Sequence, residues 1–309
     1  MKQLSTTKTS PSKNLVLRKA LVDGYMTEID NKQFKKYLLL SELVKLPDPP
    51  KTIFAMGNLA LLNQRSITII GTRKPSEYGT QVILDIVPPL ASAGISVVSD
   101  LEQGCNKIAQ QTALSHNGSI IAVLSSSLAY FKRHKLLKLI NQALEQNKGL
   151  LLSEYGKNYA PSTWKFAQRN RLIAALGQKL LVIEAGTKSG TLHTCSVAKK
   201  LNHPVFAIPG NIYSNNSIGT NNLLKNGAVP ITTSLDILSN YGKTSVSSSH
   251  KSLKPSPTQI KLLKYLDNDI STNKLARTSG IPLYKLLPLL TTMELSGLVK
   301  KLGDNWVRT

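Results

Sequence analysis

A glycine, a hydroxyl and two cations follow the short apolar run 66–70: Gly71, Thr72, Arg73 and Lys74. Glycine lets a backbone approach a ligand closely, and arginine offers a planar fork of donors that matches a phosphate. A turn of this kind, between the end of a buried strand and the start of a helix, is where open α/β sheets hold phosphate groups. The pattern therefore predicts a phosphate-binding loop, while an ordinary exposed turn with incidental charge remains the alternative.

A second segment with the chemistry of a binding site is 164–171, in which aromatic and cationic residues alternate. Aromatic rings and guanidinium planes can stack on bases, and cations can contact the sugar–phosphate backbone. The pattern is typical of a surface that holds a single nucleic-acid strand. Its candidate binding residues are Lys165, Phe166, Arg169, Asn170 and Arg171.

The charge of the chain favours a polyanionic partner. It carries 39 Lys and Arg against 17 Asp and Glu, a formal net charge of +22 over 309 residues, and nucleic acid is the default partner of so basic a protein. No stretch approaches the eighteen apolar residues of a membrane span, and no secretory segment follows the N-terminus, so we expect a soluble, cytoplasmic protein with no membrane partner. Two distant cysteines, Cys105 and Cys195, predict buried, reduced thiols rather than a disulfide framework or a metal site. We also expect no cofactor.

Apolar runs of strand length alternate with longer segments between residues 66 and 208. The runs are continuous rather than alternating, which indicates strands buried on both faces. They cover 67–70, 95–99, 119–124, 149–152, 179–184 and 205–208, with helices expected at 135–146, 166–176 and 191–201. This order predicts an α/β, Rossmann-like fold, with a mostly parallel sheet and helices on both faces. Pro88 and Pro89 predict a break or kink in the first crossover helix.

Glycines and hydroxyls recur where several of these strands should end. Ser189 and Gly190 come at the expected start of a helix, where free backbone N–H groups attract anions. Gly210 follows the run 205–208. Parallel strands bring their carboxyl ends to one edge, so we expect these residues near Arg73. Tight turns with no ligand would explain some of the same glycines.

The order of these motifs resembles the DNA-processing protein A (DprA/Smf) family. The matching segments are IIGTRKPSEYG (69–79), IAVL (121–124), LLLSEY (150–155), F-x-x-RNR (166–171), VIEA-x-x-x-SG (182–190), IPG (208–210) and 219–228, and the similarity covers about 37–238. The resemblance implies a homodimeric protein that binds and protects single-stranded DNA and loads the RecA recombinase in natural transformation. It also implies DNA-binding roles for Thr72 and Arg73 in a G-[ST]-R loop, for Lys132 near a basic pocket, for the motif residues 166 and 169–171, and for Asn221.

One loop departs from the family pattern S-G-x-A-x-G-I-D. Here residues 99–106 place Asp100 and Glu102 beside the predicted phosphate loop. We expect one of two outcomes: either these carboxylates oppose the charge of a bound strand, or they point to solvent or pair with Lys74 or Lys107.

Changes in composition, together with the extent of the resemblance, predict four parts of the chain. These are a basic, partly disordered segment (1–36), a Rossmann-like core (37–240) that the resemblance implies binds DNA, a Ser/Pro-rich linker (241–256) and a small domain (257–309) that resembles a winged helix. The alternative function is that of a nucleotide-cleaving phosphoribohydrolase of related fold. Its P-G-G-x-G-T-x-x-E motif needs a glutamate where this chain has Thr194, so we expect a binding protein and not an enzyme.

Overall fold

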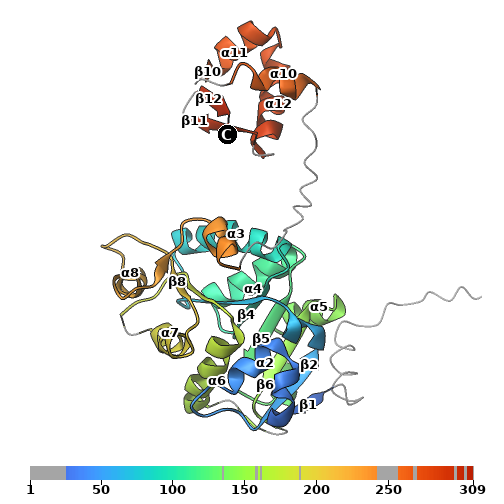
Figure 1. Ribbon diagram of the computed structural model, residues 1–309, viewed down its shortest axis with the longest axis vertical. Helices are drawn as coiled ribbons and strands as arrows, with labels where there is room; N and C mark the ends of the chain where they lie inside the picture. Colours follow the sequence, from blue (N-terminus) through green and yellow to red (C-terminus); the bar gives the residue numbers. More distant parts are fainter. Residues whose placement is uncertain are drawn as a thin grey trace, which may run out of the picture. The chain divides into compact units, whose positions relative to one another are not determined.

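The chain divides into two units, residues Met1–Gly242 and Lys243–Thr309, each described here by itself (Figure 1). The computed structural model describes residues 26–133, 136–156, 159–160, 162–187, 189–241, 257–266, 270–295, 298–302 and 305–308. Residues 1–25 of the predicted N-terminal segment and 242–256 of the predicted linker therefore lie outside the described residues.

A nine-stranded sheet forms the centre of the first unit in the described part of the chain, in the order β1-β2-β6-β5-β4-β3-β7-β8-β9. The strands are β1 (Thr27–Asp30), β2 (Thr52–Gly57), β3 (Ser66–Ile70), β4 (Ser96–Ser99), β5 (Ile120–Leu124), β6 (Gly149–Ser153), β7 (Leu180–Val182), β8 (Val205–Ala207) and β9 (Val229–Pro230). Every pair from β6 to β9 is parallel, whereas β1 and β2 are antiparallel additions at one edge. The predicted α/β fold with a mostly parallel sheet is confirmed.

Helices cover both faces of this sheet and bury two separate apolar clusters. One face packs against α3 (Glu77–Ser92), α4 (Cys105–Ser115), α5 (Leu137–Glu145) and α9 (Ser234–Leu238). The other packs against α2 (Leu38–Leu43), α6 (Thr163–Leu176), α7 (Gly190–Lys200) and α8 (Ile218–Lys225). Four short 3₁₀ helices complete the described part of the unit: η1 (Asn31–Lys36), η2 (Leu59–Asn63), η3 (Leu128–Arg133) and η4 (Ser239–Tyr241). Burial on both faces explains why the strands are continuously apolar.

The strand order reverses between β3 and β7. From β3 the chain adds β4, β5 and β6 on one side, and then returns to add β7, β8 and β9 on the other. At such a reversal the crossover connections leave in opposite directions, and a crevice opens outside the carboxyl ends of the two strands. Helix α6 is fixed beside this point, because Thr68 Oγ1 donates to the Ile173 carbonyl at 2.7 Å and Ser66 Oγ donates to the Leu176 carbonyl at 2.8 Å.

Of the predicted break or kink in helix α3, a break does not occur, because the helix is continuous to Ser92 through Pro88 and Pro89. Both prolines lie in its last two turns, and each removes only the hydrogen bond that its own N–H would donate. Residues 27–36 of the predicted N-terminal segment form β1 and η1, and β1 pairs with β2.

The second unit combines three helices with a small antiparallel sheet among its described residues. The helices are α10 (Pro257–Leu263), α11 (Thr272–Ser279) and α12 (Leu283–Leu295), and the sheet order is β10-β12-β11 (Ile270–Ser271, Asn305–Arg308 and Val299–Leu302). Leu275, Leu286, Leu290 and Trp306 are buried in its core. In neither unit do the described residues include a helix with the length and apolar character needed to span a bilayer.

Candidate functional site

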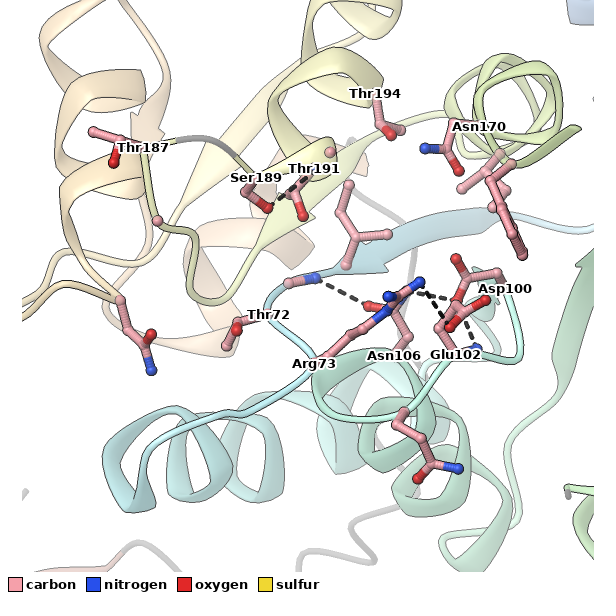
Figure 2. Close-up of a pocket in the computed structure, with 18 of the residues that line it drawn as sticks. Thr72, Arg73, Asp100, Glu102, Asn106, Asn170, Thr187, Ser189, Thr191 and Thr194 are labelled. Atoms are coloured by element: carbon pink, nitrogen blue, oxygen red, sulfur yellow. Dashed lines mark hydrogen bonds and ion pairs between the residues drawn. The ribbon is translucent and has the colours of Figure 1, made fainter. Parts of the chain in front are cut away.

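A cavity of about 700 Å³ opens at the reversal point of the sheet. It is bounded by the loops after β3, β4 and β7, by the first half of α6 and by the loop before α8, and Figure 2 shows the side chains that line it. Eight of the predicted binding residues meet here: Gly71, Thr72, Arg73, Phe166, Arg169, Asn170, Ser189 and Gly190. Gly71 and Gly190, which are 119 positions apart in the sequence, therefore share one pocket.

The loop after β3 is held rigidly by its own backbone groups. The Gly71 N–H donates to Asn106 Oδ1 at 3.0 Å, and the Thr72 N–H donates to the Glu184 carbonyl at 2.9 Å. The Thr72 carbonyl accepts the Cys105 N–H at 3.1 Å, at the start of α4. A Cβ at position 71 would lie only 2.7 Å from the Cys105 sulfur, so glycine is required there for close packing. The loop is preorganised before any ligand arrives.

Gly104 allows the loop 99–106, which carries Asp100 and Glu102, to pack closely against the predicted phosphate loop 71–74. Its φ of +83° is a conformation that L side chains rarely adopt, and an added Cβ would overlap the Thr72 carbonyl oxygen. The two loops therefore pack in direct contact, and this brings Asp100 and Glu102 into the pocket.

Asp100 and Arg169 form a buried ion pair at the floor of the pocket. Arg169 Nη2 lies 2.7 Å from Asp100 Oδ2, and the two side chains are only 6% and 7% exposed. Asp100 Oδ1 also accepts the Asn106 amide at 2.6 Å and the Glu102 N–H at 2.9 Å. A continuous network thus joins the Gly71 backbone to Arg169. Arg169 Nε is buried and has no hydrogen-bond partner among the described residues, so the guanidinium retains an unused donor.

Arg73 and Glu102 form a second pair at the mouth of the same pocket. Arg73 Nη2 lies 3.1 Å from Glu102 Oε2, and the two side chains are 68% and 28% exposed. Glu102 Oε1 also lies 3.9 Å from Arg169 Nη1. The two acids therefore pair with the arginines of the predicted site. They do not face the site unpaired, and their ion-pair partners in the described structure are not Lys74 or Lys107.

The N-terminus of α7 forms the wall opposite Arg73. Ser189 caps the helix by accepting the Thr191 N–H at 3.3 Å, and Ser189, Gly190, Thr191 and Thr194 all line the cavity. The positive end of the helix dipole favours an anion at this wall.

Four of the predicted binding residues lie outside this pocket. Arg171 pairs with Glu154 at 2.6 Å and with Asp48 at 3.6 Å, and it lines a different cavity. Gly210 and Asn221 hydrogen-bond to each other, at 3.2 and 3.0 Å. Lys74 is not among the lining residues. Arg169 and Arg171 are two residues apart on α6, which rotates them by about 200° about the helix axis. The two arginines of the motif therefore line two different cavities.

Two further lysines of the predicted site also lie elsewhere. Lys165 is buried, and its ammonium group donates to the Ala160 carbonyl at 2.7 Å. Lys132 lies in η3, and its side chain is outside the described residues. Lys165 does not line the pocket.

Glu184, which the sequence analysis did not single out, braces the site from within the core. Its buried carboxylate accepts the Ser76 N–H at 2.9 Å at the start of α3 and the Asn216 amide at 3.3 Å. Burial, and then this carboxylate, raise the pKa of the Cys105 thiol to about 12, so Cys105 stays protonated and acts as a packing group. An acid that directly follows an apolar strand is the signal that would have identified Glu184.

The sequence and the fold were compared with those of known proteins, and both comparisons point to one family. The model of the DNA recombination-mediator protein A family matches residues 27–242. DNA processing protein DprA from Streptococcus pneumoniae is 34% identical over 221 residues, covering 68% of this chain and 77% of its own length, and Protein Smf from Escherichia coli is 30% identical over 277 residues, covering 86% and 74%. The X-ray structure of the S. pneumoniae protein aligns with a TM-score of 0.63 at 31% identity, over 71% of this chain and 77% of that one. A structure of the Helicobacter pylori protein, described for its single-stranded DNA binding mode, aligns with a TM-score of 0.59 at 33% identity, over 65% and 91%.

Proposed function

Because the chain belongs to the DNA recombination-mediator protein A family, we propose that it binds single-stranded DNA in the pocket at the carboxyl ends of β3 and β7. The observation that carries the proposal is the convergence of the rigid Gly71–Arg73 loop, the buried Arg169 and the N-terminus of α7 on one cavity. Its volume of about 700 Å³ lies within the range of roughly 300–1,000 Å³ that small ligands occupy. A nucleotide unit of a strand is a ligand of this size.

Arg73 is the residue that contacts the incoming backbone in this proposal. Its guanidinium is the exposed partner of its ion pair, so a phosphate can replace the Glu102 carboxylate without breaking into the core. The planar guanidinium of Arg73 can donate paired hydrogen bonds to either a carboxylate or a phosphate, so a phosphate can take the place of the Glu102 carboxylate. Thr72 and the α7 N-terminus supply neutral donors on either side.

We further propose, on the family resemblance, that the protein protects incoming DNA and loads RecA recombinase during natural transformation. In the same proposal it acts in the cytoplasm as a homodimer and without a cofactor. The rival enzymatic function is disfavoured by Thr194: it lines the pocket at the position where glycosidic-bond cleavage would need a glutamate, and a threonine hydroxyl cannot replace that acid.

Fluorescence anisotropy across a salt series tests the proposed function. Labelled oligo-dT should bind more tightly than a duplex of the same length, because only single-stranded bases can leave the stack and enter the pocket. Counterion release predicts that log K falls with log salt by about 0.7 per phosphate neutralised. Duplex binding as tight as single-strand binding, together with a flat salt response, would overturn the proposal.

A further inference from the structure

Three aromatic rings surround the ammonium group of Lys165 at the start of α6. The nitrogen lies 4.9 Å from the ring centre of Tyr159, 5.0 Å from that of Tyr155 and 5.6 Å from that of Trp164. All three distances are within the range of about 6 Å at which a cation attracts the face of a ring. We name these three rings and this lysine the aromatic cage.

The cage is a fixed arrangement. Lys165 is 7% exposed and its ammonium group is anchored on the Ala160 carbonyl at 2.7 Å. Tyr155 and Tyr159 stack on each other with ring centres 5.8 Å apart and an angle of 29° between the planes. Side chains held in this way lose little conformational entropy when a ligand binds to them.

The outer surfaces of the cage remain open to solvent. Trp164 is 61% exposed and Tyr159 is 54% exposed. A single exposed ring is ordinary and needs no functional explanation. Here two exposed rings and the half-buried ring of Tyr155 contact one buried cation. Clustered aromatic rings with a cation are typical of surfaces that stack on bases.

The cage lies at the start of α6, the helix whose following residues line the pocket. Trp164 and Lys165 lie in the first turn of this helix, and Phe166, Arg169 and Asn170, which line the pocket, follow within the next turn and a half. Trp164 lies about 200° around the helix axis from Phe166. A strand can therefore contact both only by passing around the N-terminal end of α6, where the buried positive charge of Lys165 adds an attraction for its phosphates.

We propose that Tyr155, Tyr159 and Trp164 form a platform on which bases of the bound strand stack, with Lys165 as the positioning residue that holds the rings. This inference rests on the proposed function and extends the DNA path beyond the phosphate pocket. Stacking uses the face that every base possesses, so the platform binds bases without strong sequence preference.

Tryptophan emission tests the platform directly, because Trp164 and Trp306 are the two tryptophans of the chain. Trp306 is buried in the second unit, so a Trp306→Phe protein reports Trp164 alone. Adding oligo-dT at low salt should quench this emission with the same midpoint as the anisotropy change. Emission that stays constant while anisotropy shows full binding would overturn the platform but leave the proposed function in place.

An abasic oligonucleotide of the same length separates stacking from charge, because it keeps the phosphates and lacks the bases. In the wild type, dT should bind more tightly than the abasic strand. Trp164→Ala should weaken dT binding about 5- to 150-fold, the scale of one base–aromatic stack, and leave abasic binding unchanged. The matched control is Tyr284→Ala, which removes an exposed ring with Lys285 at 5.7 Å in the second unit and should leave both affinities unchanged. An unaltered dT preference in Trp164→Ala would overturn the platform, whereas the proposed function would fail separately, by the duplex comparison.

Discussion

Two arginine–carboxylate pairs lie at opposite ends of one pocket, and they differ mainly in their access to water. At the floor, Asp100 and Arg169 are both buried and belong to a network that reaches the Gly71 backbone. At the mouth, Arg73 and Glu102 are partly exposed. An exposed pair contributes at most about 1 kcal/mol, whereas removing one partner of a buried pair costs about 3–5 kcal/mol. The same chemistry therefore fixes geometry at the floor and leaves a donor exchangeable at the mouth.

Removing one partner of the buried Asp100–Arg169 pair should have the largest effect, and we expect that effect on the free energy of unfolding. Asp100→Ala leaves the Arg169 charge buried without its partner, so we expect the free energy of unfolding to fall by about 3–5 kcal/mol. Urea unfolding followed by Trp164 emission in the Trp306→Phe background reports the unit that contains the pair.

The matched control for Asp100 is Asp48→Ala. Asp48 is also an ion-pair partner of an arginine, at 3.6 Å from Arg171, but its side chain is 76% exposed. We expect the free energy of unfolding to change by no more than about 0.5 kcal/mol. Equal losses for the two variants would contradict the larger stabilisation assigned to the buried pair.

Breaking the mouth pair on its cationic side should weaken binding and spare stability. Arg73→Ala removes a charge-assisted donor to phosphate, so the affinity for oligo-dT should fall by about 1–3 kcal/mol. Arg73→Lys should recover only part of this loss, because the ammonium group lacks the planar fork. Anisotropy titrations with a parallel melting curve provide the measurement. Unchanged affinity in a folded Arg73→Ala protein would place the phosphate contact elsewhere.

Breaking the mouth pair on its acidic side should give the smallest effect and the opposite sign. Glu102→Ala frees Arg73 for the strand, and we expect oligo-dT to bind more tightly by on the order of 1 kcal/mol at low salt. The gain should shrink as the Debye length falls from roughly 30 Å at 0.01 M to roughly 10 Å at 0.1 M. Glu145→Ala makes the same change in net charge at an exposed position on α5 that does not line the pocket. If it tightens binding equally, net charge rather than the mouth pair explains the gain.

The sequence predicts the parts of this pocket whose determinants are local. The apolar run before Gly71 and the alternation of apolar runs with longer segments are enough to indicate strand, loop and helix, and parallel strands must bring their loops to one edge. The floor pair was not predictable in this way, because Asp100 and Arg169 are 69 positions apart and meet only when α6 packs beside β3. Which arginine of the RNR motif enters the pocket is decided by the rotation of α6 about its own axis.

Lys165 illustrates the same limit. Its position between Trp164 and Phe166 suggests a contact with phosphate, and its burial depends on Tyr155 and Tyr159, which come from the preceding loop. The edge strand β1 likewise depends on a partner, since a four-residue strand has little stability until β2 pairs with it.

The exposure of the Arg73–Glu102 pair also determines how fast the Glu102 side chain can move away from Arg73. Exposed side chains change rotamer in picoseconds to nanoseconds, whereas helices and loops that are packed into a core rearrange in microseconds or longer. In the proposed function, a strand that reaches this pocket finds the Gly71–Arg73 loop already in place, and only the Glu102 side chain has to move. We therefore expect the carboxylate at the mouth to lower the equilibrium occupancy of the site without adding a slow step to its filling, and the net positive charge of the chain to set how fast DNA arrives.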